Sequence, residues 1–187
     1  ESIGLVPSPD VKKKHHPEDP AWRPSDDATF AFGQNDLLVT PLQMACVMAS
    51  VARNEMRTYP TLEHNPNLPP DAVTQHSTPL GLTPVERKLL LDGMEKATLP
   101  GFGTAQMVAI PGLRIAAKTG TARWGPHKNT TIAWVVCFAP VDNPRIALAI
   151  AVESPTIGAD IYGGSTDGPI VHDILQEYFK LYPVNGN

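Results

Sequence analysis

The amino-acid sequence predicts an α/β fold of the α+β type, in which an antiparallel sheet is covered by helices. Residues 113–117, 131–138 and 145–152 are short runs of mainly apolar or β-branched residues bounded by turn residues, as at 142–144. Their short linkers favour antiparallel neighbours, because a parallel pair requires a crossover of about a dozen residues or more. Since the runs are apolar at successive positions, we expect helices on both faces of the sheet.

Two helices are predicted before the first strand. A Thr-Pro pair at 40–41 provides an N-cap and a proline at the first helical position. The segment 42–52 is then apolar almost all round, which predicts a buried helix. A second Thr-Pro pair at 83–84 opens the next helix, where Glu86 completes a capping box, and this helix should end near Ala97.

A third helix is predicted at the C-terminal end of the chain. We expect Asp167 to act as its N-cap. Apolar and aromatic residues then recur at steps of three and four, as one face of a helix requires. These residues are Ile170, Val171, Ile174, Leu175, Tyr178, Phe179 and Tyr182.

Two proline-rich segments, at about 6–24 and 55–82, are predicted to be irregular loops. Proline cannot continue a helix or donate to a sheet ladder, and loops of this length usually serve a site or an interface. The first segment contains the basic run 12–16, three lysines followed by two histidines. Without interleaved aromatic residues, this run is predicted to be a solvated loop rather than a nucleic-acid site.

The composition is that of a soluble globular chain with one domain. The 187 residues are 42% hydrophobic and 18% charged, with a net charge of −4 that does not favour nucleic acid or an anionic membrane. The six histidines are scattered rather than set at metal-ligand spacing, so we predict no metal and no organic cofactor. Cys46 and Cys137 are predicted to be buried thiols. No apolar run approaches the length of a membrane span, and the first residues are not a signal peptide.

The stretch AAKTGTAR, residues 116–123, indicates either a phosphate-binding loop or part of an acyl-transfer site. Residues 112–119 match the Walker pattern G-x-x-x-x-G-K-[ST], except that Ala117 replaces the second glycine. The residues before the lysine have strand character, so they cannot form the flexible loop whose N–H groups surround a phosphate. The nucleotide reading is therefore disfavoured.

The alternative is a K-T-G motif at Lys118, Thr119 and Gly120, followed by Thr121. Together with S-x-x-K and S-D-N, K-T-G is one of the three motifs of penicillin-binding proteins and serine β-lactamases. It requires a strand that presents a lysine to a cleft and a glycine that lets substrate approach the backbone. The strand predicted just before Lys118 satisfies this requirement.

Five segments, one of which contains the K-T-G motif, extend the likeness over essentially the whole chain, residues 1–187. They read GLVPSPDVKKKH, PAWRPSDDATFAFGQNDLLVTPLQMACVMASVA, GFGTAQMVAIPGLRIAAKTGTAR and WVVCFAPVDNPRIALAIAVES, and YGGSTDGPIVHDIL closes the series. In combination they resemble class B penicillin-binding proteins of the cell-elongation type. The resemblance is to the C-terminal part of the transpeptidase domain, which has the serine β-lactamase-like fold.

The resemblance implies a peptidoglycan DD-transpeptidase that cross-links stem peptides through a serine acyl-enzyme. Its substrate would be the terminal D-Ala-D-Ala, with β-lactams as mimics. Lys118 would guide the substrate carboxylate or the proton relay, and Thr119 and Thr121 would hold that carboxylate. The Thr121 N–H would be an oxyanion donor, and Gly120 would admit the substrate. Arg123 would rim the cleft, although a surface turn is the alternative for this residue.

The resemblance also implies context outside this chain. The full-length protein would be anchored in the bacterial inner membrane, face the periplasm and contact membrane proteins of the elongation machinery.

Within the chain, the resemblance assigns two further segments near the mouth of the cleft. Gly103-Thr104-Ala105 and Gly163-Gly164 look like turn elements there, and Trp134 is predicted to lie in the core.

The motif that carries the nucleophile is absent from this chain. No serine is followed by lysine at the third place, and no S-x-N occurs; Ser25-Asp26-Asp27 comes nearest, and we expect it in a surface turn. Because acyl transfer needs the serine within hydrogen-bond reach of its activating lysine, this chain alone is predicted to be inactive. The alternatives are a non-catalytic scaffold or binding protein that kept the sheet, and a β-lactamase or β-lactam sensor.

Overall fold

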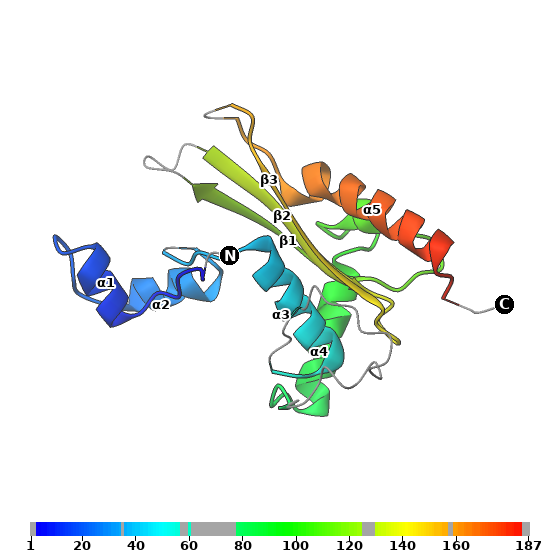
Figure 1. The fold of residues 1–187 in the computed structure, drawn as a ribbon, viewed down its shortest axis with the longest axis horizontal. Coiled ribbons are helices and arrows are strands. Elements are labelled where there is room, and N and C mark those ends of the chain that lie inside the picture. The colour runs from blue at the N-terminus through cyan, green and yellow to red at the C-terminus, as the bar shows by residue number, and fades with distance from the viewer. Residues whose placement is uncertain are drawn as a thin grey trace. The chain divides into compact units, whose positions relative to one another are not determined.

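The structure is a computed structural model that describes residues 3–34, 36–56, 60, 78–124, 130–156 and 159–184 (Figure 1). The chain divides into two compact units, Glu1–Gln43 and Met44–Asn187. The β-sheet belongs to the second unit. Most of the proline-rich segment predicted at 55–82 lies outside the described residues.

The first unit contains two short helices, α1 (Pro9–His15) and α2 (Pro24–Ala31). The prediction of an irregular loop over 6–24 is therefore wrong at α1. Pro9 stands where a helix needs no N–H donor, and the hydroxyl of Ser8 accepts the Val11 N–H at 3.2 Å. The same proline that argues against a helix interior thus begins a helix here.

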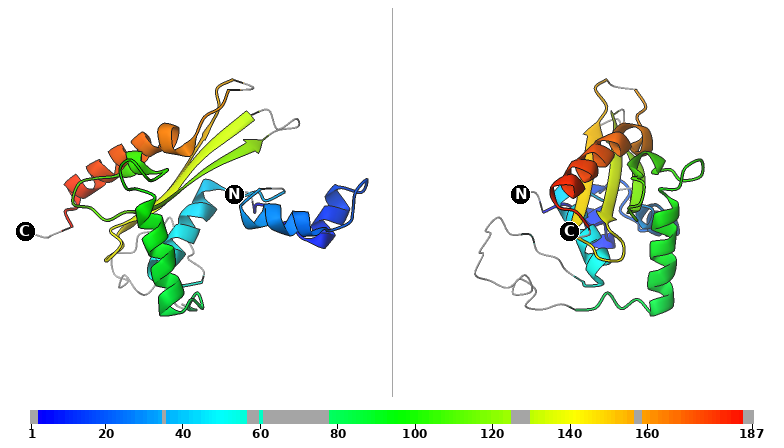
Figure 2. Two further views of the ribbon diagram at one scale, coloured as in Figure 1. Left: turned by 180° about the vertical axis from the view of Figure 1, so that it is seen from behind. Right: turned by 90° about the vertical axis from the view of Figure 1, so that its right-hand side faces the viewer.

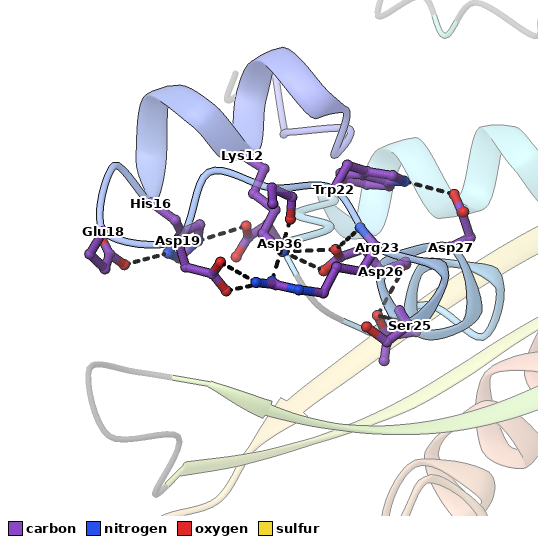
Figure 3. Close-up of polar contacts among 12 residues, drawn as sticks. Lys12, His16, Glu18, Asp19, Trp22, Arg23, Ser25, Asp26, Asp27 and Asp36 are labelled. Carbon is purple, nitrogen blue, oxygen red and sulfur yellow. Dashed lines mark hydrogen bonds and ion pairs between the residues drawn. The ribbon is translucent and has the colours of Figure 1, made fainter.

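A buried ion pair joins the two helices of the first unit (Figure 3). Lys12 Nζ donates to both carboxylate oxygens of Asp26, at 2.9 and 2.8 Å, and both residues are buried. Asp26 also accepts the Arg23 N–H at 2.7 Å. The prediction of a solvated basic run is wrong for Lys12, because its alkyl stem and ammonium lie between the helices. Asp26 likewise lies in a helix and not in the predicted surface turn.

His16 adds a second ionic link within this unit (Figure 3). Its Nε2 lies 2.8 Å from an Asp36 carboxylate oxygen, and its Nδ1 lies 3.3 Å from Glu18. The hydrogen bond to Asp36 raises the pKa of His16 above its ordinary value. Side-chain pairs thus link separate segments within the described part of this unit.

The second unit is built on a three-stranded antiparallel sheet in the order β1-β2-β3. Its strands are β1 (Ala116–Trp124), β2 (Thr130–Ala139) and β3 (Ile146–Glu153). The predicted antiparallel arrangement is confirmed. The first strand begins later than predicted, because residues 110–113 form a bridged turn around Gly112, whose φ is +79°.

Helices cover both faces of this sheet (Figures 1 and 2). On one face lie α5 (Gly163–Leu181) and the short 3₁₀ helix η2 (Gln106–Val108). On the other face, α3 (Pro41–Arg53) and α4 (Pro84–Lys96) pack against a separate cluster. The α5-side core includes Val108, Ala117, Val135, Cys137, Val171 and Leu175, and the opposite core includes Met48, Ala116, Val136 and Phe138. The predicted two-sided burial is confirmed.

Polar contacts fasten α4, whose residues are all at least partly exposed. The predicted capping box is present, since Thr83 and Glu86 bond reciprocally. Arg87 donates to the carbonyls of Val51 and Ala52 at 2.7 and 3.0 Å, which satisfies the C-terminal end of α3. The prediction that α3 is buried all round is only partly right, because Val47 is half exposed.

Candidate acyl-transfer site

The K-T-G segment lies within β1, which is an edge strand of the sheet formed by the described residues. Lys118 pairs with Val136, Gly120 with Trp134 and Thr121 with Ala133 across the β1–β2 ladder. An edge strand can pair with an extended chain laid beside it. The motif therefore occupies a strand that can accept a peptide.

The four motif residues alternate between the two faces of the sheet. Ala116 belongs to the α3–α4 side core and Ala117 to the α5-side core. By the two-residue period of a strand, Lys118 and Gly120 share the face of Ala116, whereas Thr119 and Thr121 share that of Ala117. A ligand can meet both sets only if it lies along the edge of the strand.

Lys118 places an exposed ammonium at this edge. Its Nζ donates to the carbonyl of Thr119. Within the described part of the chain, no carboxylate forms an ion pair with it. The positive charge is thus open to an anionic ligand.

Thr119 binds a loop residue that the sequence did not single out as its partner. Its Oγ1 donates to Thr104 Oγ1 at 2.9 Å. Thr104 lies in the Gly103-Thr104-Ala105 turn, which was predicted near the cleft mouth, and Ala105 anchors that turn in the core. The contact spans 15 positions in the chain, so no local pattern could reveal it.

Gly120 is constrained by its cross-strand neighbour. A Cβ at this position would lie 3.3 Å from Trp134 Cβ, which is tighter than ordinary contact. Trp134 is only partly buried, so its predicted core position is half right. The glycine therefore serves the packing of the sheet, besides leaving the backbone accessible.

Arg123 lies at the far end of β1 and is already engaged. Its Nη2 lies 3.4 Å from Asp160 Oδ1, and Thr131 Oγ1 reaches the same oxygen at 3.5 Å. The ion pair is exposed on both sides, so it contributes little to stability. Asp160, 37 positions away, was not predicted and is the neighbour that neutralises this arginine.

Asp167 does not cap α5. The helix begins at Gly163, and Tyr162 occupies the N-cap position without a side-chain cap bond. Asp167 lies in the second turn with no exposed surface, and neither carboxylate oxygen has a hydrogen-bond partner in the described structure. Burial raises its pKa to about 6. The capping prediction is wrong because the helix extends through Pro169 toward Gly163.

No group of three or more histidine, cysteine or acidic side chains within the described ranges is placed to hold a metal ion. None of the helices described there is long and apolar enough to cross a membrane.

The two cysteines differ in burial. Cys137 is buried as predicted, and burial raises the pKa of its thiol to about 12. Cys46 is only half buried.

Comparison with known proteins decides between the candidate families. The family model of the penicillin-binding protein transpeptidase domain matches residues 9–176. The chain belongs to this transpeptidase family. The resemblance read from the K-T-G strand and its companion segments is therefore confirmed, and the nucleotide-binding alternative is excluded.

Two relatives and two solved structures show how far the similarity reaches. Escherichia coli K12 peptidoglycan D,D-transpeptidase FtsI is 33% identical over 86% of this chain and 26% of its own length. Mycolicibacterium smegmatis peptidoglycan D,D-transpeptidase PbpA is 34% identical over 75% of this chain and 29% of its own. This penicillin-binding transpeptidase chain thus spans about a quarter of the relatives that it matches.

The fold is also that of known transpeptidase structures. Pseudomonas aeruginosa PBP2 superposes with a TM-score of 0.74 at 28% identity, covering 96% of this chain and 39% of that one. The apo transpeptidase domain of Burkholderia pseudomallei penicillin-binding protein 3 gives 0.73 at 27% identity, over 100% and 52%. The predicted penicillin-binding fold class is confirmed.

Proposed function

We propose that this chain is the C-terminal portion of a peptidoglycan DD-transpeptidase of the elongation type, and that β1 forms one wall of its acyl-transfer cleft. The observation that carries the proposal is the position of Lys118-Thr119-Gly120-Thr121 on an edge strand, with the Lys118 ammonium exposed and without a carboxylate partner among the described residues. Membership of the penicillin-binding transpeptidase family supports it.

The substrate is a peptidoglycan stem peptide that ends in D-Ala-D-Ala and lies extended along the edge of β1. Because Lys118 and the two threonines leave the strand on opposite faces, a ligand along the edge is the arrangement that reaches both. Lys118 attracts the terminal carboxylate or supports the proton relay. Thr119 and Thr121 bind the carboxylate, and the Thr121 N–H donates to the developing oxyanion.

Arg123 forms the outer rim of the site and is shared with Asp160. β-Lactams bind the same strand as mimics of the stem peptide. No metal or organic cofactor takes part in this chemistry. The full-length protein acts on the outer side of the bacterial inner membrane, in contact with membrane proteins of the elongation machinery.

The nucleophilic serine and its lysine belong to the opposite wall of the cleft. The sequence of this chain contains no S-x-x-K, so the N-terminal half of the domain must supply both groups. The matched part of this chain covers only 26% and 29% of the length of two relatives, which supports this assignment. The chain alone therefore forms no acyl-enzyme.

Labelled penicillin and intact-mass analysis test the proposal. The 187-residue chain should keep its unmodified mass, whereas the full-length protein should gain one penicilloyl group. A stable adduct on the chain alone would contradict the assignment of the nucleophile. Absence of an adduct on both would favour the non-catalytic scaffold, and an adduct that hydrolyses within seconds would favour a β-lactamase.

A further inference from the structure

Asp167 is a carboxylic acid in the apolar interface between α5 and the sheet. It has no exposed surface, and both of its oxygens lack a hydrogen-bond partner in the described structure. Buried acidic side chains are almost always paired, because an ionised carboxylate without a partner is costly in a low-dielectric interior. A buried carboxyl group without a hydrogen-bond partner requires an explanation, and a functional role can provide one.

The turn of α5 that precedes Asp167 rests on the K-T-G strand. Gly163 lies one helical turn before it on the same face of α5. A Cβ on Gly163 would lie 2.1 Å from the Trp134 carbonyl oxygen and 2.9 Å from that of Gly120. The N-terminal turn of α5 therefore lies against the backbone of Gly120, the glycine of the motif.

The next residue connects this turn to the threonine pair of the site. A Cβ on Gly164 would lie 2.1 Å from the Thr104 carbonyl oxygen and 3.9 Å from Thr119 Cγ2. Thr104 in turn accepts the hydrogen bond of Thr119. An outward shift of the first turns of α5 would thus change the contacts of both Thr119 and Gly120.

We propose that Asp167 is a positioning residue of the transpeptidase site, whose protonation state sets how closely α5 holds the K-T-G strand. This inference rests on the proposed function. With Asp167 neutral, the glycine turn lies against β1 and Thr119 keeps its place. When Asp167 ionises, the carboxylate must gain water, and the first turns of α5 loosen from the strand.

The surroundings of Asp167 offer no compensating charge among the described residues. Burial raises its pKa to about 6, and the N-terminal dipole of α5 acts mainly on the first turn, which Asp167 lies beyond. On the α5-facing side of the elements packed against this helix, the titratable groups are Cys137 on β2 and Arg123 on β1, with none on η2. By strand alternation, Lys118 of β1 and Glu153 of β3 lie on the opposite face of the sheet. The thiol of Cys137 is neutral, and Arg123 is paired with Asp160. On α5 itself, His172 binds the Ala109 carbonyl and Asp173 is exposed.

The direct test is the pH profile of β-lactam acylation in the full-length protein. Asp167→Asn keeps the shape without the ionisation, Asp167→Ala removes the polar group, and Asp173→Asn is the matched control on the exposed face of the same helix. A group with a pKa of about 6 falls from roughly 90% to roughly 3% protonated between pH 5 and pH 7.5. We expect the ratio of wild-type to Asp167→Asn rate constants to fall at least about fivefold over this range, and the ratio for Asp173→Asn to stay constant. A constant ratio for Asp167→Asn would overturn the proposal.

A second measurement keeps the inference separate from the proposed function. Amide hydrogen exchange of residues 118–121, compared at pH 7.5, should be faster in the wild type than in Asp167→Asn and Asp167→Ala, and unchanged by Asp173→Asn. If no variant is acylated but this difference is present, the proposed function fails and the coupling of Asp167 to β1 stands. If the exchange rates are equal, the coupling is refuted, whatever the acylation rates are.

Discussion

The glycine at the start of α5 allows a sharp test of how this helix is seated on the sheet. In Gly163→Ala, the new Cβ would lie 2.1 Å from the Trp134 carbonyl oxygen, about 1.3 Å short of the 3.4 Å at which ordinary contact begins. The atom it meets is backbone in the middle of β2 and cannot rotate away. The helix must therefore shift outward, at a cost of about 1–3 kcal/mol in unfolding free energy.

The same substitution in α4 provides the matched control. A Cβ on Gly93 meets nothing within 4 Å, so Gly93→Ala should gain up to about 1 kcal/mol from helix propensity alone. Urea unfolding followed by circular dichroism measures both changes. The packing argument predicts opposite signs for the two variants. If Gly163→Ala were as stable as the wild type, the close approach of α5 to β1 and β2 would be refuted.

Two further predictions concern buried groups. Asp26→Asn leaves the Lys12 ammonium between the helices without its carboxylate partner. It should lower the unfolding free energy of the first unit by about 3 kcal/mol in denaturant unfolding. An unchanged unfolding free energy would show that water solvates the Lys12 ammonium in the folded state. The Cys137 thiol, whose pKa is raised to about 12, should react with iodoacetamide at pH 8 at least about a hundredfold more slowly in the folded than in the urea-unfolded protein. Similar rates in both states would place this residue outside the core.

Local signals predicted much of the second unit. The reciprocal bonds of Thr83 and Glu86 are set by residues three positions apart, and the antiparallel strands follow from short linkers between apolar runs. The strand predicted at 113–117 is present in part, and β1 continues through the K-T-G segment to Trp124. These features depend on neighbours in the sequence, which pattern and composition can report.

The features that were missed depend on contacts between distant segments. The Lys12–Asp26 pair spans 14 positions and joins two helices, one of which lies where an irregular loop was predicted. Asp167 has the residue type and position of a helix cap, and only the packing of α5 against η2 and the sheet shows it to be buried. The chemistry of a side chain is readable from the sequence, whereas its burial is a property of the assembled layers.

The role of Lys118 tests the account most directly. The rate at which benzylpenicillin acylates the full-length protein should fall about a hundredfold in Lys118→Met, because the charge that guides and stabilises the reacting group is lost. Lys88→Met, which removes an exposed lysine of α4, should leave the rate unchanged. If Lys118→Met retained its fold and acylated at the wild-type rate, β1 would not be a wall of the acyl-transfer site.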